Sequence, residues 1–200
     1  MKNIAVFASG NGSNLQAIID VIKRGKLKVN LALVISDNKD AFALVRAQKA
    51  GVKSIFINPK NFVSKEEFEK EIIKYLKQEK IDLIVLAGFM RILSKHFVRL
   101  YKNKILNIHP ALLPSFKGSY GIKDAFNYGV KITGVTVHFV DSKMDHGPIV
   151  LQEAVKINKT DTLKSLEEKI HEIEHKIYPK AIKLFSLGKI RLKARRTVIF

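Results

Sequence analysis

An asparagine and a histidine, one residue apart, end a short apolar run near the middle of the chain. Asn107 and His109 belong to the stretch Asn-Ile-His-Pro-Ala-Leu-Leu-Pro, which follows Ile105. On an extended strand this spacing turns both side chains to one face, and Pro110 keeps His109 out of a helix. An amide donor beside an imidazole suits a reaction in which a carbonyl oxygen gains negative charge. Taken alone, most such stretches are polar strand ends before a proline turn.

A glycine-rich run stands where the first expected strand turns into the first expected helix. It reads Gly10-Asn11-Gly12-Ser13-Asn14. Glycines let a backbone approach a phosphate closely, and the amides at a helix start favour an anion. A dinucleotide site would require a third glycine where the chain has Leu15, although Asp37 stands where a ribose-binding acid is expected. The run favours a single phosphate, with a turn that only packs as the alternative.

A mixed apolar and cationic segment, Ala87–Leu93, follows another apolar run. Its apolar side chains, Met90, Ile92 and Leu93, can line a pocket, while Arg91 is a cation suited to a carboxylate. On the residues alone, the edge of a core with one exposed arginine is the simpler interpretation.

Two acidic residues in the second half are also candidates. Asp145 lies in the turn Asp-His-Gly-Pro, where an aspartate usually accepts a backbone hydrogen bond. Glu174 lies in an amphipathic segment, where pairing with a nearby lysine is the ordinary expectation. The six histidines show no metal-ligand spacing, so we expect no metal site.

In their order and spacing, these segments resemble the phosphoribosylglycinamide formyltransferase family, folate-dependent enzymes of purine synthesis. The resemblance runs from Ile4 to about Leu187. It implies transfer of a formyl group from 10-formyltetrahydrofolate to the amine of glycinamide ribonucleotide. It also implies that Asn107, His109 and Asp145 are catalytic: the first two stabilise a tetrahedral oxyanion, and Asp145 supports removal of the amine proton. His109 would protonate the leaving folate nitrogen.

The resemblance also implies the binding residues. Gly12, Ser13 and Asn14 would hold the ribose phosphate, and Glu174 the ribose hydroxyls. The segment of Met90, Arg91, Ile92 and Leu93 would line the folate pocket, with Arg91 near the acidic tail of the cosubstrate.

The chain departs from some members of the family at two positions, and a third position has two interpretations. Tyr120 lies where others have a histidine, and His146 follows the aspartate in place of an acidic or small residue. The first difference concerns the local charge near the reaction intermediate, and the second is milder. His138 is either a satisfied histidine of a sheet or a catalytic helper.

Apolar runs alternate with amphipathic segments over the first half, which predicts parallel strands joined by helices. Strands are expected at Asn3–Ala8, Val29–Ser36, Val52–Ile57, Leu83–Ala87 and Ile105–Ile108, and helices at Ser13–Arg24, Ala41–Ala50, Lys65–Glu79 and Lys95–Tyr101. The second half predicts a loop at Gly118–Gly121, a helix at Asp124–Tyr128, strands at Lys131–Val140 and Ile149–Val155, and a helix at Thr162–Leu187.

We therefore predict one α/β domain over residues 1–200, with the Rossmann-like, mixed but mostly parallel sheet of the formyltransferase fold and helices on both faces. Residues 1–100 would form the phosphate- or nucleotide-binding half, and residues 101–200 the catalytic and folate-binding half. The basic cluster Arg191–Arg196 is expected in an exposed terminal strand.

The composition points to a cytoplasmic globular enzyme. Hydrophobic residues make up 46% of 200, cysteine is absent, and no apolar run is long enough for a signal peptide or a membrane span. The net charge is +18, but the basic excess is spread over both halves, is mostly lysine and lacks interleaved aromatic residues. We therefore expect small anionic substrates rather than nucleic acid or a membrane. A homodimer is left open.

Three alternatives remain. A formyltetrahydrofolate deformylase is expected to carry an extra amino-terminal domain and a histidine in place of Pro110. A methionyl-tRNA formyltransferase is expected to carry a further carboxy-terminal domain. A non-catalytic nucleotide- or RNA-binding module would leave Asn107, His109 and Asp145 without a joint purpose.

Overall fold

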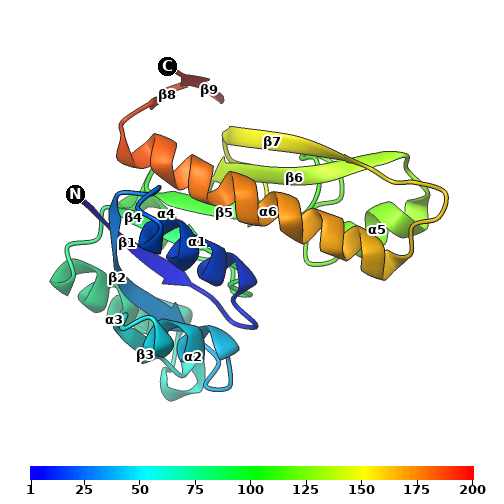
Figure 1. Cartoon of the computed structure of the whole chain (residues 1–200). Coiled ribbons are helices and arrows are strands. Elements are labelled where there is room, and N and C mark those ends of the chain that lie inside the picture. Colours follow the sequence, from blue (N-terminus) through cyan, green and yellow to red (C-terminus); the bar gives the residue numbers. More distant parts are fainter. The chain divides into compact units, whose positions relative to one another are not determined.

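Runs of buried aliphatic side chains form the strands of the first half. Ile4, Val6 and Phe7 are fully buried, as are Leu83 and Val85, which is the pattern of parallel strands covered on both faces. In the computed structural model, which describes residues 1–200, one seven-stranded sheet has the order β3-β2-β1-β4-β5-β6-β7 (Figure 1). The mixed, mostly parallel α/β fold predicted from the sequence is confirmed.

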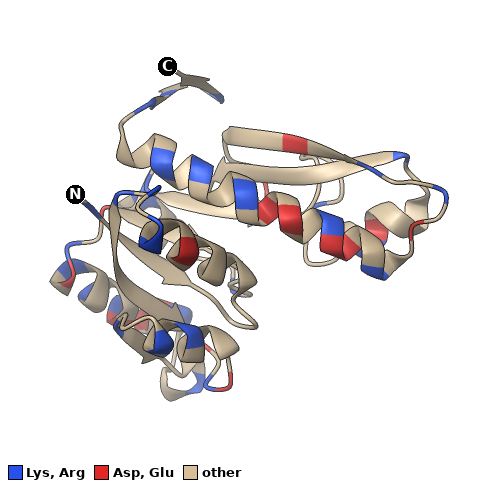
Figure 2. Ribbon diagram, viewed as in Figure 1, with Lys and Arg blue, Asp and Glu red and all other residues tan.

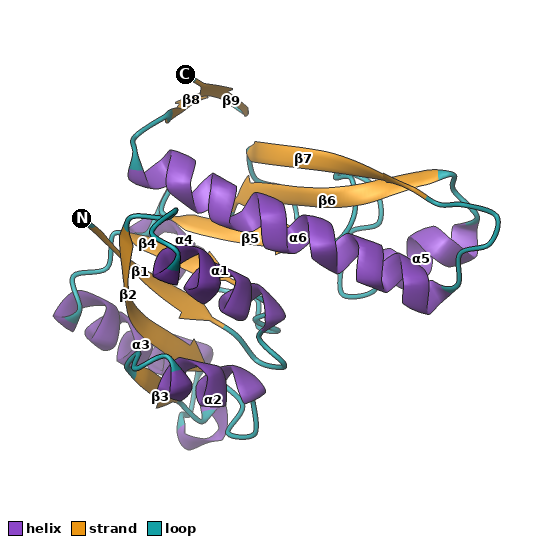
Figure 3. Cartoon of the chain, in the orientation of Figure 1, coloured by secondary structure: helices purple, strands orange, loops and turns teal.

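The chain forms two compact units, Met1–Leu106 and Asn107–Phe200. The first contains β1 (Lys2–Phe7), α1 (Ser13–Lys23), β2 (Val29–Ser36), α2 (Phe42–Lys49), β3 (Ser54–Phe56), the short 3₁₀ helix η1 (Pro59–Asn61), α3 (Lys65–Gln78), β4 (Leu83–Leu86) and α4 (Lys95–Leu100). Strand β1 pairs in parallel with β2 and β4, and β2 with β3. Helices lie on both faces of these strands (Figure 3).

Strand β5 (Ile105–His109) spans the boundary between the units, and the second unit continues from its last three residues. It contains α5 (Gly121–Tyr128), β6 (Ile132–Phe139), β7 (Ile149–Lys156), α6 (Leu163–Ser186), β8 (Ile190–Lys193) and β9 (Arg196–Ile199). Strands β6 and β7 are antiparallel, and α6 packs against both of them and against α5. Thr162 caps α6 by accepting the N–H of Ser165.

Three local expectations need correction. The terminal basic cluster forms a two-stranded hairpin, β8–β9, rather than one strand, because the chain reverses at Ala194 with a φ of 54°. Helix α5 begins at Gly121 rather than Asp124, so that Gly121 leaves the expected loop. Sequence analysis did not predict η1, which starts at Pro59 and is capped by Asn58.

Lysine and arginine are spread over the helices and loops of both units (Figure 2). No helix is both long enough and apolar enough to traverse a lipid bilayer.

Candidate active site

The polar end of β5 brings Asn107 and His109 to one face, as their spacing predicted. The strand ends at His109, where Pro110 removes a backbone donor and fixes φ. The His109 side chain is buried, while Asn107 is partly exposed. The imidazole is therefore shielded from bulk water.

His109 is held in one orientation. Its Nε2 lies 2.7 Å from the carbonyl oxygen of Phe116, and since a carbonyl only accepts, Nε2 carries the proton of this bond. Its Nδ1 lies 3.5 Å from Oδ2 of Asp145. When the ring gains a second proton, Nδ1–H points toward that carboxylate. Asp145 therefore stabilises the charged form of His109.

Asp145 is fixed by its backbone and by a loop amide. Its φ is 46°, and Oδ2 accepts the N–H of Gly118 at 2.8 Å. Burial raises the pKa of this carboxyl, but His138, the N–H of Gly118 and the charge of His109 outweigh it, and the pKa lies below the ordinary value of 3.8. Asp145 is thus a fixed negative charge at neutral pH.

His138 lies beside this cluster, and protein groups engage both of its ring nitrogens, so a catalytic role for it stays a prediction. Nδ1–H of His138 donates to the carbonyl of Phe139 at 2.8 Å, which leaves Nε2 as an acceptor in the neutral ring. Nδ2 of Asn107 lies 3.2 Å from this Nε2 and donates to it. Oδ1 of Asp145 lies 3.8 Å away. His138 therefore orients the amide of Asn107.

A buried polar network holds the segment after β5. The Thr136 hydroxyl, fully buried on β6, donates to the carbonyl of Ala111 at 2.7 Å and accepts the N–H of Leu113 at 3.0 Å. Nε2 of Gln152 on β7 donates to the same hydroxyl and to the carbonyl of Leu113, at 2.9 Å and 3.0 Å. The Thr136 hydroxyl therefore both donates and accepts within this network, which holds the chain from Ala111 to Leu113 in place.

Gly121 explains why α5 starts early. A Cβ at this position would lie 3.1 Å from the carbonyl oxygen of Phe116 and 3.3 Å from Nε2 of His109. The first residue of α5 therefore packs against the bond that orients His109, and a side chain there would press on it. Tyr120, the departure noted above, is 69% exposed.

In the first unit, the glycine run forms the turn into α1. Gly12 has a φ of 74°, and no side chain caps the helix that follows. Arg46 on α2 holds this turn by donating to the carbonyl of Asn11 at 2.9 Å and to its Oδ1 at 3.0 Å. Ser13 is partly exposed and Asn14 is buried. That these residues bind a phosphate stays a prediction.

Gly12 has a packing role as well. A Cβ on Gly12 would lie 2.8 Å from Cβ and 2.9 Å from Cα of Ala43, the second residue of α2. Any side chain at position 12 would thus displace α2, whether or not a phosphate binds. Substitution of Gly12 is therefore a poor test of phosphate binding.

The segment after β4 exposes apolar side chains. Met90 is 69% exposed and Ile92 66%. Two large apolar side chains exposed in one short loop fit a surface that a ligand covers. Leu93 is partly exposed. Arg91 donates from Nε to Oδ2 of Asp37 at 2.9 Å.

Asp37 is already engaged by two groups. Besides Arg91, the Ser9 hydroxyl donates to its Oδ1 at 2.5 Å. The same hydroxyl accepts the N–H of Met90 at 3.0 Å. Asp37 therefore links the start of the glycine run to the segment after β4. Because both of its carboxylate oxygens are already used, Asp37 is a poorer candidate for binding the ribose of a nicotinamide dinucleotide.

Glu174 is buried on α6, where its Oε2 accepts a hydrogen bond from Nδ1 of His171 at 2.9 Å. This bond raises the pKa of His171, against the opposing effect of burial, and Glu167 adds to the rise. Because the pKa of His171 is raised on folding, the ion pair stabilises the fold fully at pH values below 6.5, the ordinary pKa of histidine. This stabilisation is lost as the pH rises through the folded-state pKa.

This pair gives a direct prediction. Glu174→Gln should return the pKa of His171 toward 6.5, because the charge that favours the imidazolium is gone. Titration of the His171 ring protons by NMR measures this, with Glu172→Gln as the control, since Glu172 is exposed and adjacent in sequence. An unchanged His171 titration in Glu174→Gln would contradict the pairing.

No group of three or more histidine, aspartate or glutamate side chains is arranged to hold a metal ion.

Comparison with known proteins gives consistent matches. A family model described as formyl transferase matches residues 2–182. Phosphoribosylglycinamide formyltransferase of Bacillus subtilis is 44% identical over 183 residues, 92% of this chain and 94% of that protein. The trifunctional purine biosynthetic protein adenosine-3 of Bos taurus is 44% identical over 94% of this chain, which spans only 19% of that protein. The crystal structure of glycinamide ribonucleotide transformylase 1 from Symbiobacterium toebii matches with a TM-score of 0.97 and 42% identity, over 100% of this chain and 94% of that one.

Proposed function

The chain belongs to the formyl transferase family, and on this premise we propose that it transfers a formyl group from 10-formyltetrahydrofolate to the amine of glycinamide ribonucleotide, a step of de novo purine synthesis. The observation that carries the proposal is the cluster of Asn107, His109 and Asp145 in the second unit. It supplies an amide donor, an imidazole and a fixed carboxylate around the end of β5. The relatives' names supply the substrate.

The chemistry divides among these groups. The substrate amine attacks the formyl carbon, and the carbonyl oxygen becomes an oxyanion that Asn107 and the charged form of His109 stabilise. On attack the amine becomes positively charged and gives up a proton, which the Asp145 carboxylate accepts through a water molecule. His109 gives its proton to the folate nitrogen, the carbon–nitrogen bond to folate breaks, and the proton held by Asp145 returns to His109. Asp145, with its lowered pKa, is a weak base, so it also acts as a negative charge that stabilises positive charge on His109 and on the attacking amine.

The Nε2–H of His109 is donated to the carbonyl of Phe116. Donation from Nε2 to the reacting atoms therefore requires exchange of this bond for one to the substrate. The binding roles of Gly12, Ser13, Asn14 and Glu174 toward glycinamide ribonucleotide, and of Met90–Leu93 toward the folate, are part of the same proposal. The exposed side chains of Met90 and Ile92 support the folate role.

The decisive assay incubates the purified protein with 10-formyltetrahydrofolate and glycinamide ribonucleotide. We expect formylglycinamide ribonucleotide and tetrahydrofolate in equal amounts, only when both substrates are present. Release of formate without the ribonucleotide would indicate a hydrolase. Transfer of the formyl group to methionyl-tRNA would indicate a methionyl-tRNA formyltransferase. Either result would replace the proposal.

The phosphate prediction needs a variant that leaves α2 in place. Ser13→Asp adds a negative charge at the first residue of α1, where an acid suits the helix dipole and should not harm folding. If the phosphate binds there, like-charge repulsion should weaken glycinamide ribonucleotide binding about tenfold or more. Calorimetric titration with each ligand measures this.

Ser13→Ala is the matched control, since it keeps the backbone amides and adds no charge. Folate binding should be unchanged in both variants. If Ser13→Asp and the wild type bind the ribonucleotide with equal affinity, the phosphate does not bind at the start of α1.

A further inference from the structure

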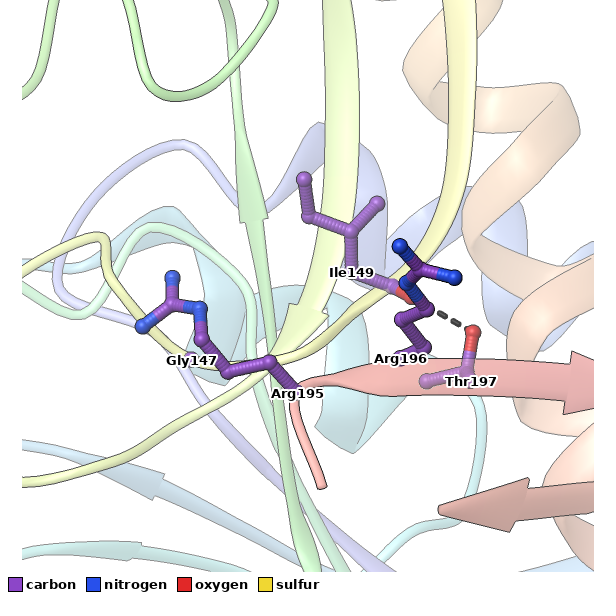
Figure 4. Close-up of a pocket in the computed structure, with 5 residues that line it drawn as sticks. All are labelled: Gly147, Ile149, Arg195, Arg196 and Thr197. Carbon is purple, nitrogen blue, oxygen red and sulfur yellow. Dashed lines mark hydrogen bonds between the residues drawn. The ribbon is translucent and has the colours of Figure 1, made fainter. Parts of the chain in front are cut away.

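The turn of the carboxy-terminal hairpin contacts the loop that carries Asp145. Arg195, between β8 and β9, donates from Nη1 to Nε2 of His146 at 2.7 Å and from Nη2 to the carbonyl oxygen of His146 at 2.7 Å. Nδ1 of His146 lies 2.6 Å from Oδ2 of Asp141. Figure 4 shows the Arg195 side chain extending away from β9. We name these three residues, Asp141, His146 and Arg195, the arginine clamp.

The direction of each bond in the clamp follows from the donor inventory. Arginine has no acceptor, so Nε2 of His146 must be unprotonated and accept from Arg195. Nδ1–H of His146 then donates to the Asp141 carboxylate. Burial raises the pKa of this carboxyl, but the bond to His146, the N–H of Lys143 and the charge of Arg195 outweigh it, so the pKa is lowered. His146, the neighbour of Asp145, is thereby held at both its carbonyl oxygen and its side chain.

Two other contacts fix the far end of the loop. A Cβ on Gly147 would lie 1.8 Å from the carbonyl oxygen of Phe139, so the loop closes directly on the end of β6. The Thr197 hydroxyl of β9 donates to the carbonyl of Ile149 at 2.6 Å (Figure 4). Asp145 lies between these attachments and has a left-handed φ of 46°, a conformation that a non-glycine residue keeps only when its surroundings impose it.

A hollow of about 350 Å³ beside these contacts is lined by Gly147, Ile149, Arg195, Arg196 and Thr197. The Arg195 side chain hydrogen-bonds to His146. The Arg196 side chain instead lines the hollow beside Ile149 and Thr197 (Figure 4).

We propose that Arg195 is a positioning residue for formyl transfer: through His146 it holds Asp145 in the conformation in which the carboxylate faces His109. The proposal rests on the proposed function. Arg195 contacts neither Asp145 nor His109, so its effect must pass through the loop. Without Arg195, the backbone of Asp145 can leave the left-handed conformation. Its carboxylate can then lose its contacts with the N–H of Gly118 and the imidazole of His109.

The test compares Arg195→Ala with Arg196→Ala, a matched removal of the adjacent arginine. For Arg195→Ala we expect kcat to fall about tenfold, with dissociation constants of both substrates within twofold of wild type. Arg196→Ala should behave as wild type. In an Asp145→Asn background, Arg195→Ala should lower the residual rate no further, because both changes act through one group. An additive loss would overturn the proposal.

A second readout does not depend on turnover. NMR titration of the Asp145 carboxyl carbon should show a pKa below 3.8 in the wild type and a higher pKa in Arg195→Ala, with Arg196→Ala unchanged. If the wild type shows no formyl transfer, the proposed function fails, and this titration alone judges the clamp. If the wild type transfers formyl but Arg195→Ala matches it in kcat and in this titration, only the clamp fails.

Discussion

Asp145→Asn should lower the single-turnover rate of formyl transfer by about 10²–10⁴, the usual effect of losing a positioned acid–base or charged group. The substitution keeps the size of the side chain and one oxygen for the N–H of Gly118, but removes the negative charge 3.5 Å from Nδ1 of His109. The imidazolium that supports the oxyanion and protonates the leaving nitrogen then loses its counter-charge. Dissociation constants should change far less, because the charge acts mainly in the transition state.

A structural role for Asp145 would give the opposite pattern. The melting temperature would fall, and the molecules that remain folded would turn over at nearly the normal rate. Single-turnover rate, both dissociation constants and thermal stability, measured on one preparation, separate the two. A rate within a few-fold of wild type would end the catalytic assignment. Asp124→Asn, on the first turn of α5, is a control for the loss of one acidic charge from the same unit.

Gly147→Ala should have the largest effect on stability of any single methyl group added to the loop. Its Cβ would lie 1.8 Å from the carbonyl oxygen of Phe139 and 2.8 Å from the carbonyl carbon, both backbone atoms that cannot rotate away. Ordinary overpacking costs about 1–3 kcal/mol, and we expect more here. Because Phe139 also accepts the Nδ1–H bond of His138, the displacement reaches the active site, and activity should fall with stability.

Gly188→Ala is the matched control. Gly188 follows α6 with a φ of 67°, and no atom lies within 4 Å of a Cβ placed there. The alanine therefore costs only the left-handed conformation, about 1 kcal/mol. Chemical denaturation of both variants gives the comparison. A Gly147→Ala protein no less stable than Gly188→Ala would show that the loop closes on β6 more loosely than the structure has it.

The sequence was sufficient for the strands of the first unit because their side chains are buried on both faces. Continuous apolar runs such as Ile4–Ala8 are typical of such strands. Two of the helices between the strands begin after a serine cap, Ser64 and Ser94. The start of α5 was missed because Gly121 has a low helix propensity and is present for its small size against His109. The hairpin β8–β9 was missed because its turn has no glycine or asparagine at the left-handed position, which Ala194 occupies.

For the site, spacing in the sequence placed Asn107 and His109 together, whereas the joint use of these residues with Asp145 came from the resemblance to a family. The partners that orient them carry no such signal. The acceptor for His109 is a backbone carbonyl, that of Phe116, and any residue type has one. Arg195 lies 49 positions from His146, and without a second sequence nothing marks the two as neighbours.

The bond between His109 and the carbonyl of Phe116 has a consequence for substrate binding. The Nε2–H of His109 cannot be donated to this carbonyl and to a formyl group at once, so a substrate that uses Nε2 must replace the carbonyl. A ligand that replaces the carbonyl must compensate for that bond, which lowers the apparent affinity by the fraction of molecules in which it is broken.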